Sequence, residues 1–297
     1  MRVRSAGKIA DRLWYLGREE AGVYVLEGNE SSIMINGGLS FILPDVLNQM
    51  KELGIDAGKI AKFLILHSHF DHVGIVPYFK RTWPEIEVLA GARAWDILKM
   101  PKAVETMNSF SRLVTKQMKA GAGLDAYDLD WRDDVAGGTV KEGDTIDLGD
   151  RVLRIMETPG HSSCSISAYE PDMKAMFASD AGGIPYKDSS FPSGNSDFTL
   201  FQKTLERLNK LPVDYLCADH YGYVTGEEAR GFIGLTIEEA RKLREEMEQI
   251  IGKENGDLDA AARVCNSLFF QRNPDYFIAP EILEGVFKQM LKHVAKG

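Results

Sequence analysis

The sequence predicts an α/β fold in which two β-sheets pack face to face with helices outside, an αββα sandwich. Two observations lead to this prediction. Residues 12–90 and 138–217 are both rich in strand-like segments, and both follow the same crude order of strands and then a helix. After residue 226 only helical patterns remain, which predicts a main domain over residues 1–226 and a helical C-terminal cap over residues 227–297.

The first half opens with strands. Three short apolar runs bounded by turn residues are predicted as strands at 12–16, 22–26 and 32–36. Residues 43–53 have helical apolar spacing, and Gly54 is expected to end that helix. Residues 62–66 form a continuous apolar run, as expected for a strand at a buried central position.

The middle of the chain is predicted to be mainly helical. A helix around 73–81 and a strand over 86–90 are expected first. Residues 91–120 then form a mostly helical insert with a break at Met100-Pro101. Residues 121–137 are rich in Gly and Asp and are predicted as a loop.

The second half returns to strands, which are predicted at 144–148, 151–157, 164–169 and 174–179. Residues 182–197 hold many Gly, Pro, Ser and Asn residues and are predicted as a loop. A helix is expected over about 198–210, and the last strand over 213–217. Amphipathic helices are predicted for the tail at 227–251, 258–269 and 279–295.

The most informative motif is His67-Ser68-His69-Phe70-Asp71-His72, which directly follows the apolar run 63–66. Three His and one Asp so close together cannot all lie in an apolar core, because their polar atoms would be unsatisfied there. A solvated turn is the alternative. Histidine is the commonest metal-binding side chain, and carboxylates can join or bridge metals. The motif therefore predicts a metal site at the carboxyl end of a strand, where open sheets place ligands.

Three further candidate ligands follow at long spacing, each at the end of an apolar, strand-like run: His161, Asp180 and His220. His67 and His69 alternate in an extended segment, so both can point the same way. The predicted ligands of one metal are His67, His69 and His161, and those of a second metal are Asp71, His72 and His220. Asp180 is the expected bridge between them, because one carboxylate has two oxygens.

Such a site predicts hydrolytic chemistry. Two metals about 3.5–4 Å apart can share a hydroxide, and metal-bound water has a pKa of about 7. We expect two divalent metal ions, Zn with Fe or Mn as alternatives, because His/Asp sets accept all three. The bridging hydroxide would attack an ester or thioester carbonyl. Asp71 and Asp180 would act catalytically by keeping the metals and the hydroxide in place.

The order of these motifs is similar to that of the metallo-β-lactamase superfamily, and the match extends over roughly residues 10–225. The resemblance implies the αββα fold and a dinuclear hydrolase site. Each of seven residues matches a ligand position of the family: His67, His69, Asp71, His72, His161, Asp180 and His220. True β-lactamases usually lack the bridging Asp. Asp180 therefore favours the thioesterase, lactonase and phosphoesterase branches.

Residues 63–72, 74–79 and 83–90 resemble the quinolone signal response thioesterases of pseudomonads more closely. That resemblance implies an acyl-CoA thioesterase with a helical C-terminal cap, which fits the insert at 91–120 and the tail. One departure is Ser179, which stands where that family has Gly before its bridging Asp.

Four function hypotheses remain open at this point. The favoured one is an acyl-CoA thioesterase. Hydrolysis of a lactone or a phosphodiester is an alternative, and an iron-dependent persulfide dioxygenase is another because that branch can show the same ligand run. The last is a regulatory or binding protein with a structural metal site. Structural sites are usually closed and four-coordinate, whereas seven ligands for two metals leave positions open, which favours catalysis.

Several neighbouring residues allow two interpretations. Tyr221 and Tyr223 flank His220 and could stabilise an oxyanion or pack beneath the metal loop. Asp219 could orient a ligand or belong to a plain turn. Cys164 is expected to be a buried strand cysteine, and His293 a surface or packing histidine.

The composition limits the partners. The formal net charge is −9 and no Lys/Arg run occurs, so tight nucleic-acid binding is not expected. No segment approaches the about 18–20 apolar residues of a membrane span. Three cysteines without a regular spacing imply no disulfide framework, and a cytoplasmic location is expected. The expected partner is a small-molecule substrate, acyl-CoA being favoured. The apolar faces of the tail bury either against the body or in a homodimer.

Overall fold

The computed structural model describes residues 1–296 and contains two seven-stranded sheets. The first sheet has the order β2 (Gly7–Ala10), β3 (Leu13–Gly17), β4 (Gly22–Glu27), β5 (Ser32–Ile35), β6 (Ile60–Leu64), β7 (Glu87–Gly91) and β8 (Gly138–Val140). Strands β2 to β5 pair antiparallel, and β5 to β8 pair parallel. The parallel strands therefore all end at the same edge of the sheet.

The second sheet has the order β1 (Arg2–Val3), β16 (Tyr223–Thr225), β15 (Tyr215–Cys217), β12 (Ala175–Phe177), β11 (Ile166–Glu170), β10 (Val152–Glu157) and β9 (Thr145–Asp147). Only β12 and β15 pair parallel; the other neighbours are antiparallel. The N-terminal residues thus enter the sheet formed by the second half of the chain.

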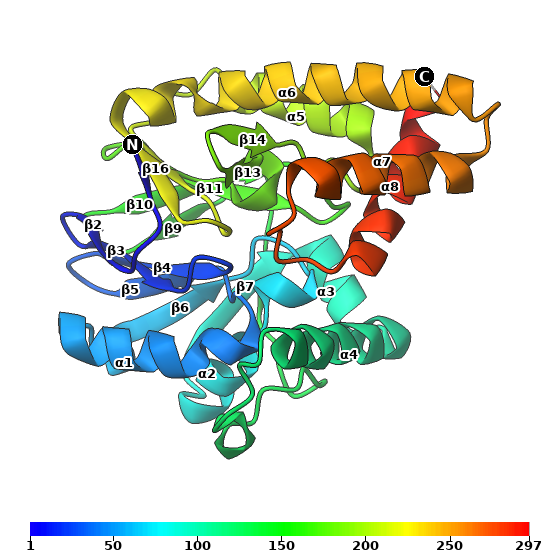
Figure 1. The fold of residues 1–297 in the computed structure, drawn as a ribbon. Helices are drawn as coiled ribbons and strands as arrows, with labels where there is room; N and C mark the ends of the chain where they lie inside the picture. Colours follow the sequence, from blue (N-terminus) through cyan, green and yellow to red (C-terminus); the bar gives the residue numbers. More distant parts are fainter. Residues whose placement is uncertain (297) are drawn as a thin grey trace.

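Helices cover the outer faces of both sheets (Figure 1). Those below the first sheet are α1 (Leu43–Leu53) and α2 (Val76–Thr82), followed along the chain by α3 (Ala92–Leu98) and α4 (Pro101–Gln117). Those above the second sheet are α5 (Phe198–Leu208) and α6 (Gly226–Lys253). The last two, α7 (Leu258–Arg272) and α8 (Pro280–Val294), pack on each other beside α5 and α6. The predicted αββα sandwich is confirmed.

The alternation of side chains along β4 shows how the layers are joined. Tyr24 and Leu26 face the second sheet, where the Tyr24 ring lies 5.5 Å from that of Phe177. Val23 and Val25 point the other way, into the core beneath the helices. Each strand thus contributes to two apolar layers, which explains why the central strands are apolar on both faces.

Local sequence signals located several elements closely. Helix α1 has the predicted bounds, and Gly54 ends it with a left-handed φ of 70°. The insert divides into α3 and α4 at Met100, as the proline at position 101 predicted. Strand β6 lies two residues before its predicted position, because the residues after Leu64 leave the sheet toward the histidine motif.

Two predictions were wrong. The segment 182–197 was expected to be only a loop, but it contains the hairpin β13 (Ile184–Tyr186) and β14 (Ser189–Phe191), against which α6 packs. The strand at 213–217 was expected to be the last, but β16 follows it and pairs with β1. Both errors concern three-residue strands, which are too short to show a period in the sequence.

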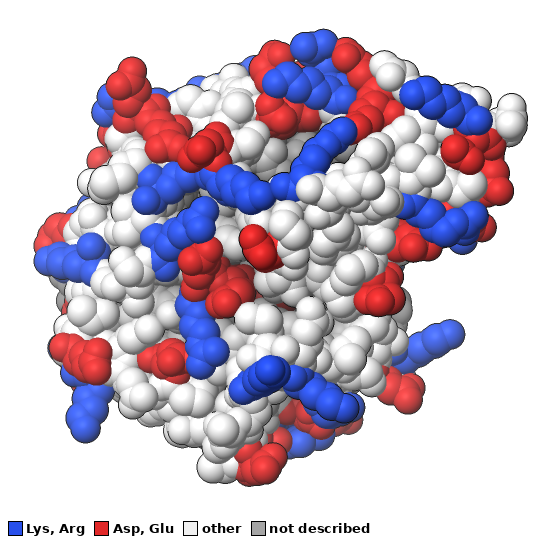
Figure 2. Space-filling model, viewed as in Figure 1, with Lys and Arg blue, Asp and Glu red and all other residues white. Residues whose placement is uncertain are grey.

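The tail is joined to the body through a shared core. Helix α6 contacts α5 and strands β14, β15 and β16, and it buries Phe232, Ile233 and Met247 in the same hydrophobic cluster as residues of the first half. The predicted boundary at residue 226 stays a prediction. No helix among residues 1–296 has both the length and the apolarity needed to cross a membrane. Acidic and basic side chains are interspersed on the face seen in Figure 2.

Candidate metal centre

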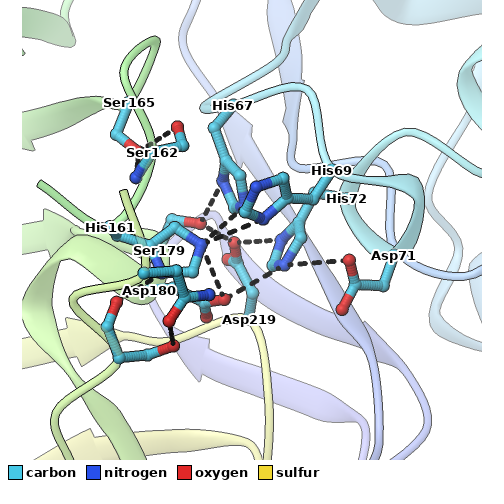
Figure 3. A network of polar contacts seen from close by, with 12 residues as sticks. His67, His69, Asp71, His72, His161, Ser162, Ser165, Ser179, Asp180 and Asp219 are labelled. Atoms are coloured by element: carbon cyan, nitrogen blue, oxygen red, sulfur yellow. Dashed lines mark hydrogen bonds and ion pairs between the residues drawn. The ribbon is translucent and has the colours of Figure 1, made fainter. Parts of the chain in front are cut away.

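Four loops carry the predicted ligands to one place. The histidine motif leaves the end of β6 and includes a short 3-10 turn, Phe70–His72. His161 lies between β10 and β11, Asp180 in the turn Ser179–Gly182 after β12, and His220 between β15 and β16. In Figure 3 the side chains of the histidine motif, His161 and Asp180, which come from both halves of the chain, point toward one another.

The first group consists of His67, His69 and His161. His67 Nε2 lies 3.1 Å from His69 Nδ1 and 3.2 Å from His161 Nε2, and the last two nitrogens are 3.1 Å apart. A ring nitrogen either carries a proton and donates or lacks one and accepts, so three in mutual contact cannot satisfy all three contacts. A single cation would accept all three lone pairs, so this group fits a metal ion.

The second group consists of Asp71, His72 and His220. The Nε2 atoms of His72 and His220 are 3.2 Å apart. Asp71 places Oδ1 3.7 Å from His72 Nε2 and Oδ2 3.5 Å from His220 Nε2. Two nitrogens and a carboxylate thus converge on one point, which leaves room for further ligands.

Asp180 lies between the two groups. Its Oδ2 is 3.4 Å from His161 Nε2 in the first group and 3.3 Å from His72 Nε2 in the second, and its Oδ1 is 3.7 Å from His220 Nε2. The side chain is buried. The structure therefore brings together all seven residues that the sequence singled out, and these His/Asp clusters fit metal binding.

In four of the five imidazoles, the ring nitrogen that faces away from the centre makes a contact that orients the ring. The Nδ1 atom of His72 contacts Asp219 Oδ2 at 2.9 Å, that of His161 contacts the Ser193 carbonyl at 2.7 Å, and that of His67 contacts Ser179 Oγ at 3.2 Å. His220 uses Nδ1 toward the carbonyl of Glu20. These partners leave Nε2 free to face the centre, as in metal sites whose histidines are held by a second layer of hydrogen bonds.

Burial keeps the first group neutral. It lowers the pKa of His67 and of His161 below their ordinary values, and together with the charge of His161 it lowers the pKa of His69 to about 3. A neutral imidazole has the lone pair that a metal requires.

Charge pairing dominates the second group. Burial acts to lower the pKa of His72, but Asp71 and Asp180 outweigh it and raise that pKa well above the ordinary value. Burial likewise acts to raise the pKa of Asp180, but His220, His72 and His161 outweigh it and hold that pKa well below the usual range. Both carboxylates thus favour positive charge between them, which a metal cation can supply in place of a proton.

The centre forms the floor of a cavity of about 1170 Å³. Five of the seven residues line it: His69, Asp71, His161, Asp180 and His220. Further walls come from α4, from the loop before α8 and from α8 itself, and the β13–β14 hairpin and residues 193–196 also contribute. A ligand entering the cavity can therefore reach both groups.

The structure also resolves the open interpretations of neighbouring residues. Tyr221 packs its ring 4.8 Å from that of Tyr186 and does not line the cavity, and Tyr223 lies between the sheets, so neither faces the centre. Asp219 contacts His72 directly. Cys164 is buried 3.3 Å from the hydroxyl oxygens of two serines, and His293 is a partly exposed residue near Asp197.

Sequence reasoning did not assign two aromatic residues of the tail to the metal centre. Tyr276 lines the cavity, and Phe277 packs its ring 5.0 Å from that of His220. They lie in the turn between α7 and α8, after Asn273-Pro274-Asp275. The run Tyr276-Phe277-Ile278 after a polar Asn-Pro-Asp turn was the available signal, because exposed turns seldom hold several large apolar side chains.

The family is decided by the sequence match. A family model described as the metallo-beta-lactamase superfamily matches residues 17–220. The chain belongs to this superfamily. The match ends at His220 and includes all seven residues of the centre, and it confirms the resemblance expected from the motifs.

Curated relatives in this superfamily are hydrolases. The acyl-coenzyme A thioesterase MBLAC2 of Gallus gallus is 26% identical over 230 residues, which is 72% of this chain and 77% of the relative. The Homo sapiens protein of the same name is 29% identical and covers 56% of this chain and 60% of the relative. A hydroxyacylglutathione hydrolase of Methylobacterium sp. (strain 4-46) is 27% identical over 46% of this chain and 40% of its own length. These relatives support a hydrolase.

Solved structures agree on the fold. An archaeal metallo-beta-lactamase superfamily protein from Sulfolobus tokodaii aligns with a TM-score of 0.61 at 22% identity, over 96% of this chain and 98% of its own. A metallo-beta-lactamase family protein from Thermus thermophilus aligns with a TM-score of 0.66 at 16% identity, over 96% of this chain and 93% of its own. Both alignments extend over the helical tail as well as the sandwich.

Proposed function

We propose that the protein is a metal-dependent thioester hydrolase whose favoured substrate is an acyl-coenzyme A. The observation that carries the proposal is a His/Asp metal-donor set at the floor of a large cavity with mostly apolar walls. Similarity to acyl-coenzyme A thioesterases supports the choice of a thioester. The hydroxyacylglutathione hydrolase relatives make a glutathione thioester the second candidate.

The proposed ligands are His67, His69 and His161 for one divalent ion, and Asp71, His72 and His220 for the other, with Asp180 between them. When bound, two such ions supply an activated water at neutral pH and polarise a substrate carbonyl. Zn²⁺ is the favoured ion, with Fe or Mn as alternatives, because His/Asp donor sets accept all three.

The carboxylates place the attacking water. Asp71 and Asp180 both line the cavity, and Asp180 stays ionised because the surrounding imidazoles lower its pKa. An ionised carboxylate accepts a hydrogen bond from the water and directs its lone pair toward the substrate. In the reaction a C–O bond to the water forms and the C–S bond breaks. One proton goes to the leaving sulfur, and the other is released as the carboxylic acid ionises.

Tyr276 is the proposed hydrogen-bond donor to the substrate carbonyl. Burial, the neighbouring Tyr221 and the carboxylates of Asp180 and Asp71 raise the pKa of its phenol well above the ordinary value. The phenol therefore keeps its proton and can donate to an oxygen on which negative charge develops. Phe277, packed on His220, excludes water from the same side.

Metal analysis joined to a substrate panel tests the proposal. Protein purified without chelator is assayed for Zn, Fe and Mn, and the same sample is given acyl-coenzyme A, S-acylglutathione, a simple ester, a lactone and a phosphodiester. Oxygen uptake is followed with glutathione persulfide. We expect about two metal ions per chain and preferential thioester cleavage. Preferential cleavage of the lactone or phosphodiester, or oxygen uptake with the persulfide, would replace the thioesterase assignment by the corresponding alternative.

A further inference from the structure

Two apolar helix faces meet across the cavity above the metal centre. Met107, Phe110 and Leu113 follow one another at helical spacing along α4, and Ile282 and Val286 do so along α8. Phe110 and Leu113 are 37% and 49% exposed, which is unusual for large apolar residues of a folded protein. Exposed apolar side chains that gather in one concave place indicate a binding surface.

This apolar space is continuous with the centre. Phe70 follows the ligand His69 directly, and its ring lies 5.7 Å from that of Phe110. The same cavity is lined by Phe110 and by five of the seven residues of the centre. Its volume of about 1170 Å³ exceeds the about 300–1,000 Å³ of ordinary small-molecule pockets. Space therefore remains beyond a thioester group placed at the metals.

Gly285 keeps the passage between the helices open. It lies inside α8, lines the cavity, and has no atom within 4 Å of the position that a Cβ would occupy. Glycine weakens a helix interior, so α8 loses stability by having no side chain there. On the facing helix, Ala103 and Thr106 are also small.

Charge is confined to the ends of this passage. The charged side chains that α4 and α8 contribute to the cavity are Lys102 and Glu281, both exposed and both in the first turn of their helix. Further along, the facing walls are mainly apolar. A polar or ionised substituent would lose its hydration there without a partner, whereas a hydrocarbon chain gains by burial.

We propose that this cavity binds the acyl chain of the substrate and that the substrate is a thioester of a long hydrocarbon chain, which runs from the metal centre between α4 and α8. The inference rests on the proposed function for the position of the thioester. It assigns the specificity for chain length to the passage past Gly285 and Phe110.

The test narrows the passage. Gly285→Trp places an indole in the passage. Gly231→Trp is the matched control: Gly231 also lies inside a helix, α6, and no atom lies within 4 Å of its Cβ position, but it does not line the cavity. Hydrolysis of hexanoyl-, dodecanoyl- and hexadecanoyl-coenzyme A is measured for each metal-loaded protein. Binding of dodecanoate and hexadecanoate is measured by calorimetry as a readout independent of turnover.

In the wild type, affinity should rise with chain length by up to about fourfold per buried methylene. Gly285→Trp should lower kcat/KM for the hexadecanoyl thioester at least tenfold, reduce it much less for the hexanoyl thioester, and weaken hexadecanoate binding in parallel. Gly231→Trp should behave as the wild type. Equal effects of Gly285→Trp on all chain lengths, or no dependence on length in the wild type, would overturn the proposal.

A second pair of variants and a comparison of binding with hydrolysis distinguish the possible results. If Gly285→Trp does not fold, as judged by circular dichroism, Phe110→Asp replaces it with Ser109→Asp as control, because Ser109 is exposed on the same helix but does not line the cavity. The same loss for long chains is then expected. Length-dependent fatty-acid binding without hydrolysis of any thioester would contradict the proposed function while supporting the apolar passage.

Discussion

The orientation of single imidazole rings decides what the centre can bind. A histidine binds a metal ion only if one ring nitrogen directs its lone pair at the ion. A hydrogen bond to the other ring nitrogen fixes the tautomer and the ring orientation that this requires. In this protein Asp219 performs this task for His72 and also accepts a hydrogen bond from Ser179 Oγ. Ser179 in turn contacts His67. A small polar network thus connects His72 of the second group with His67 of the first, both of which are proposed ligands.

Removing Asp219 should therefore weaken metal binding without touching a ligand. We expect Asp219→Ala to lower metal affinity by about 10–100-fold, because His72 loses the partner that orients it. Competition with a chromophoric chelator measures the change. Asp214→Ala is the control, since Asp214 pairs with the exposed Arg230. Equal affinities of Asp219→Ala and the wild type would show that the contact with His72 has no orienting role.

Substitution can distinguish the histidines proposed to bind metal from a histidine outside the centre. His69→Ala removes one nitrogen from the first group, so we expect it to lose at least one metal ion per chain and nearly all hydrolytic activity while remaining folded. His293→Ala should keep both, because His293 lies outside the centre beside Asp197. Elemental analysis and circular dichroism on the same samples measure these outcomes. Full activity of metal-depleted His69→Ala would refute the ligand assignment.

At the scale of elements, the loops after the strands hold the site, and their backbone is tightly constrained. Gly160 precedes His161 with φ +125°, and a Cβ there would lie 2.3 Å from the backbone nitrogen of Phe201 in α5. Its carbonyl accepts hydrogen bonds from the backbone nitrogens of Ser196 and Asp197. The His161 loop is therefore fixed against the start of α5 by contacts that only glycine permits.

Gly160→Ala should consequently displace His161. We expect a loss of about 2–4 kcal/mol in the free energy of unfolding, from backbone strain together with the clash on Phe201, and weaker metal binding. Gly143→Ala is the control that measures the effect of backbone strain without a clash, because Gly143 also has a positive φ but no atom within 4 Å of its Cβ position. That control should lose only about 1 kcal/mol and keep its metal affinity. Denaturant titration measures the free energy of unfolding of both variants, and chelator competition measures their metal affinity. Equal losses in Gly160→Ala and Gly143→Ala would exclude the clash with Phe201 as the cause.

At the scale of the whole molecule, the tail contributes to the core and to the cavity together. Helix α6 buries Phe232, Ile233 and Met247 and packs on the second sheet, the β13–β14 hairpin and the other C-terminal helices. The segment after α7 then brings Tyr276 and Phe277 to the metal centre. The family match ends at residue 220, yet the walls of the cavity include residues far beyond it.

A chain that ends at residue 226 should therefore not fold stably. Losing one buried Phe side chain alone costs about 3–5 kcal/mol, and domains have only about 5–15 kcal/mol of stability. A chain that ends at residue 253 keeps α6, so we expect it to unfold cooperatively but at a lower Tm than the full chain. Calorimetry distinguishes the two. Cooperative unfolding of the chain 1–226 at the Tm of the full protein would instead establish an independent domain that ends there.

Local sequence was enough to predict the elements with strong local signals and the set of His and Asp residues that meet at the centre. Helix α1 could be bounded because its apolar spacing and Gly54 are local, and the seven His/Asp residues could be selected because each follows a strand-like run. Side-chain type and short-range period are properties of neighbouring residues, so they are visible without a fold. The superfamily followed from the order of these motifs alone.

Which distant segments meet became visible only in the folded chain. The pairing of β1 with β16 and the approach of Tyr276 and Phe277 to the centre depend on contacts between residues far apart in the chain. The apolar passage between α4 and α8 has the same origin, because an amphipathic helix shows which of its faces is apolar but not what that face will meet. The sequence could therefore predict the reaction class, whereas the shape of the substrate site arises from packing.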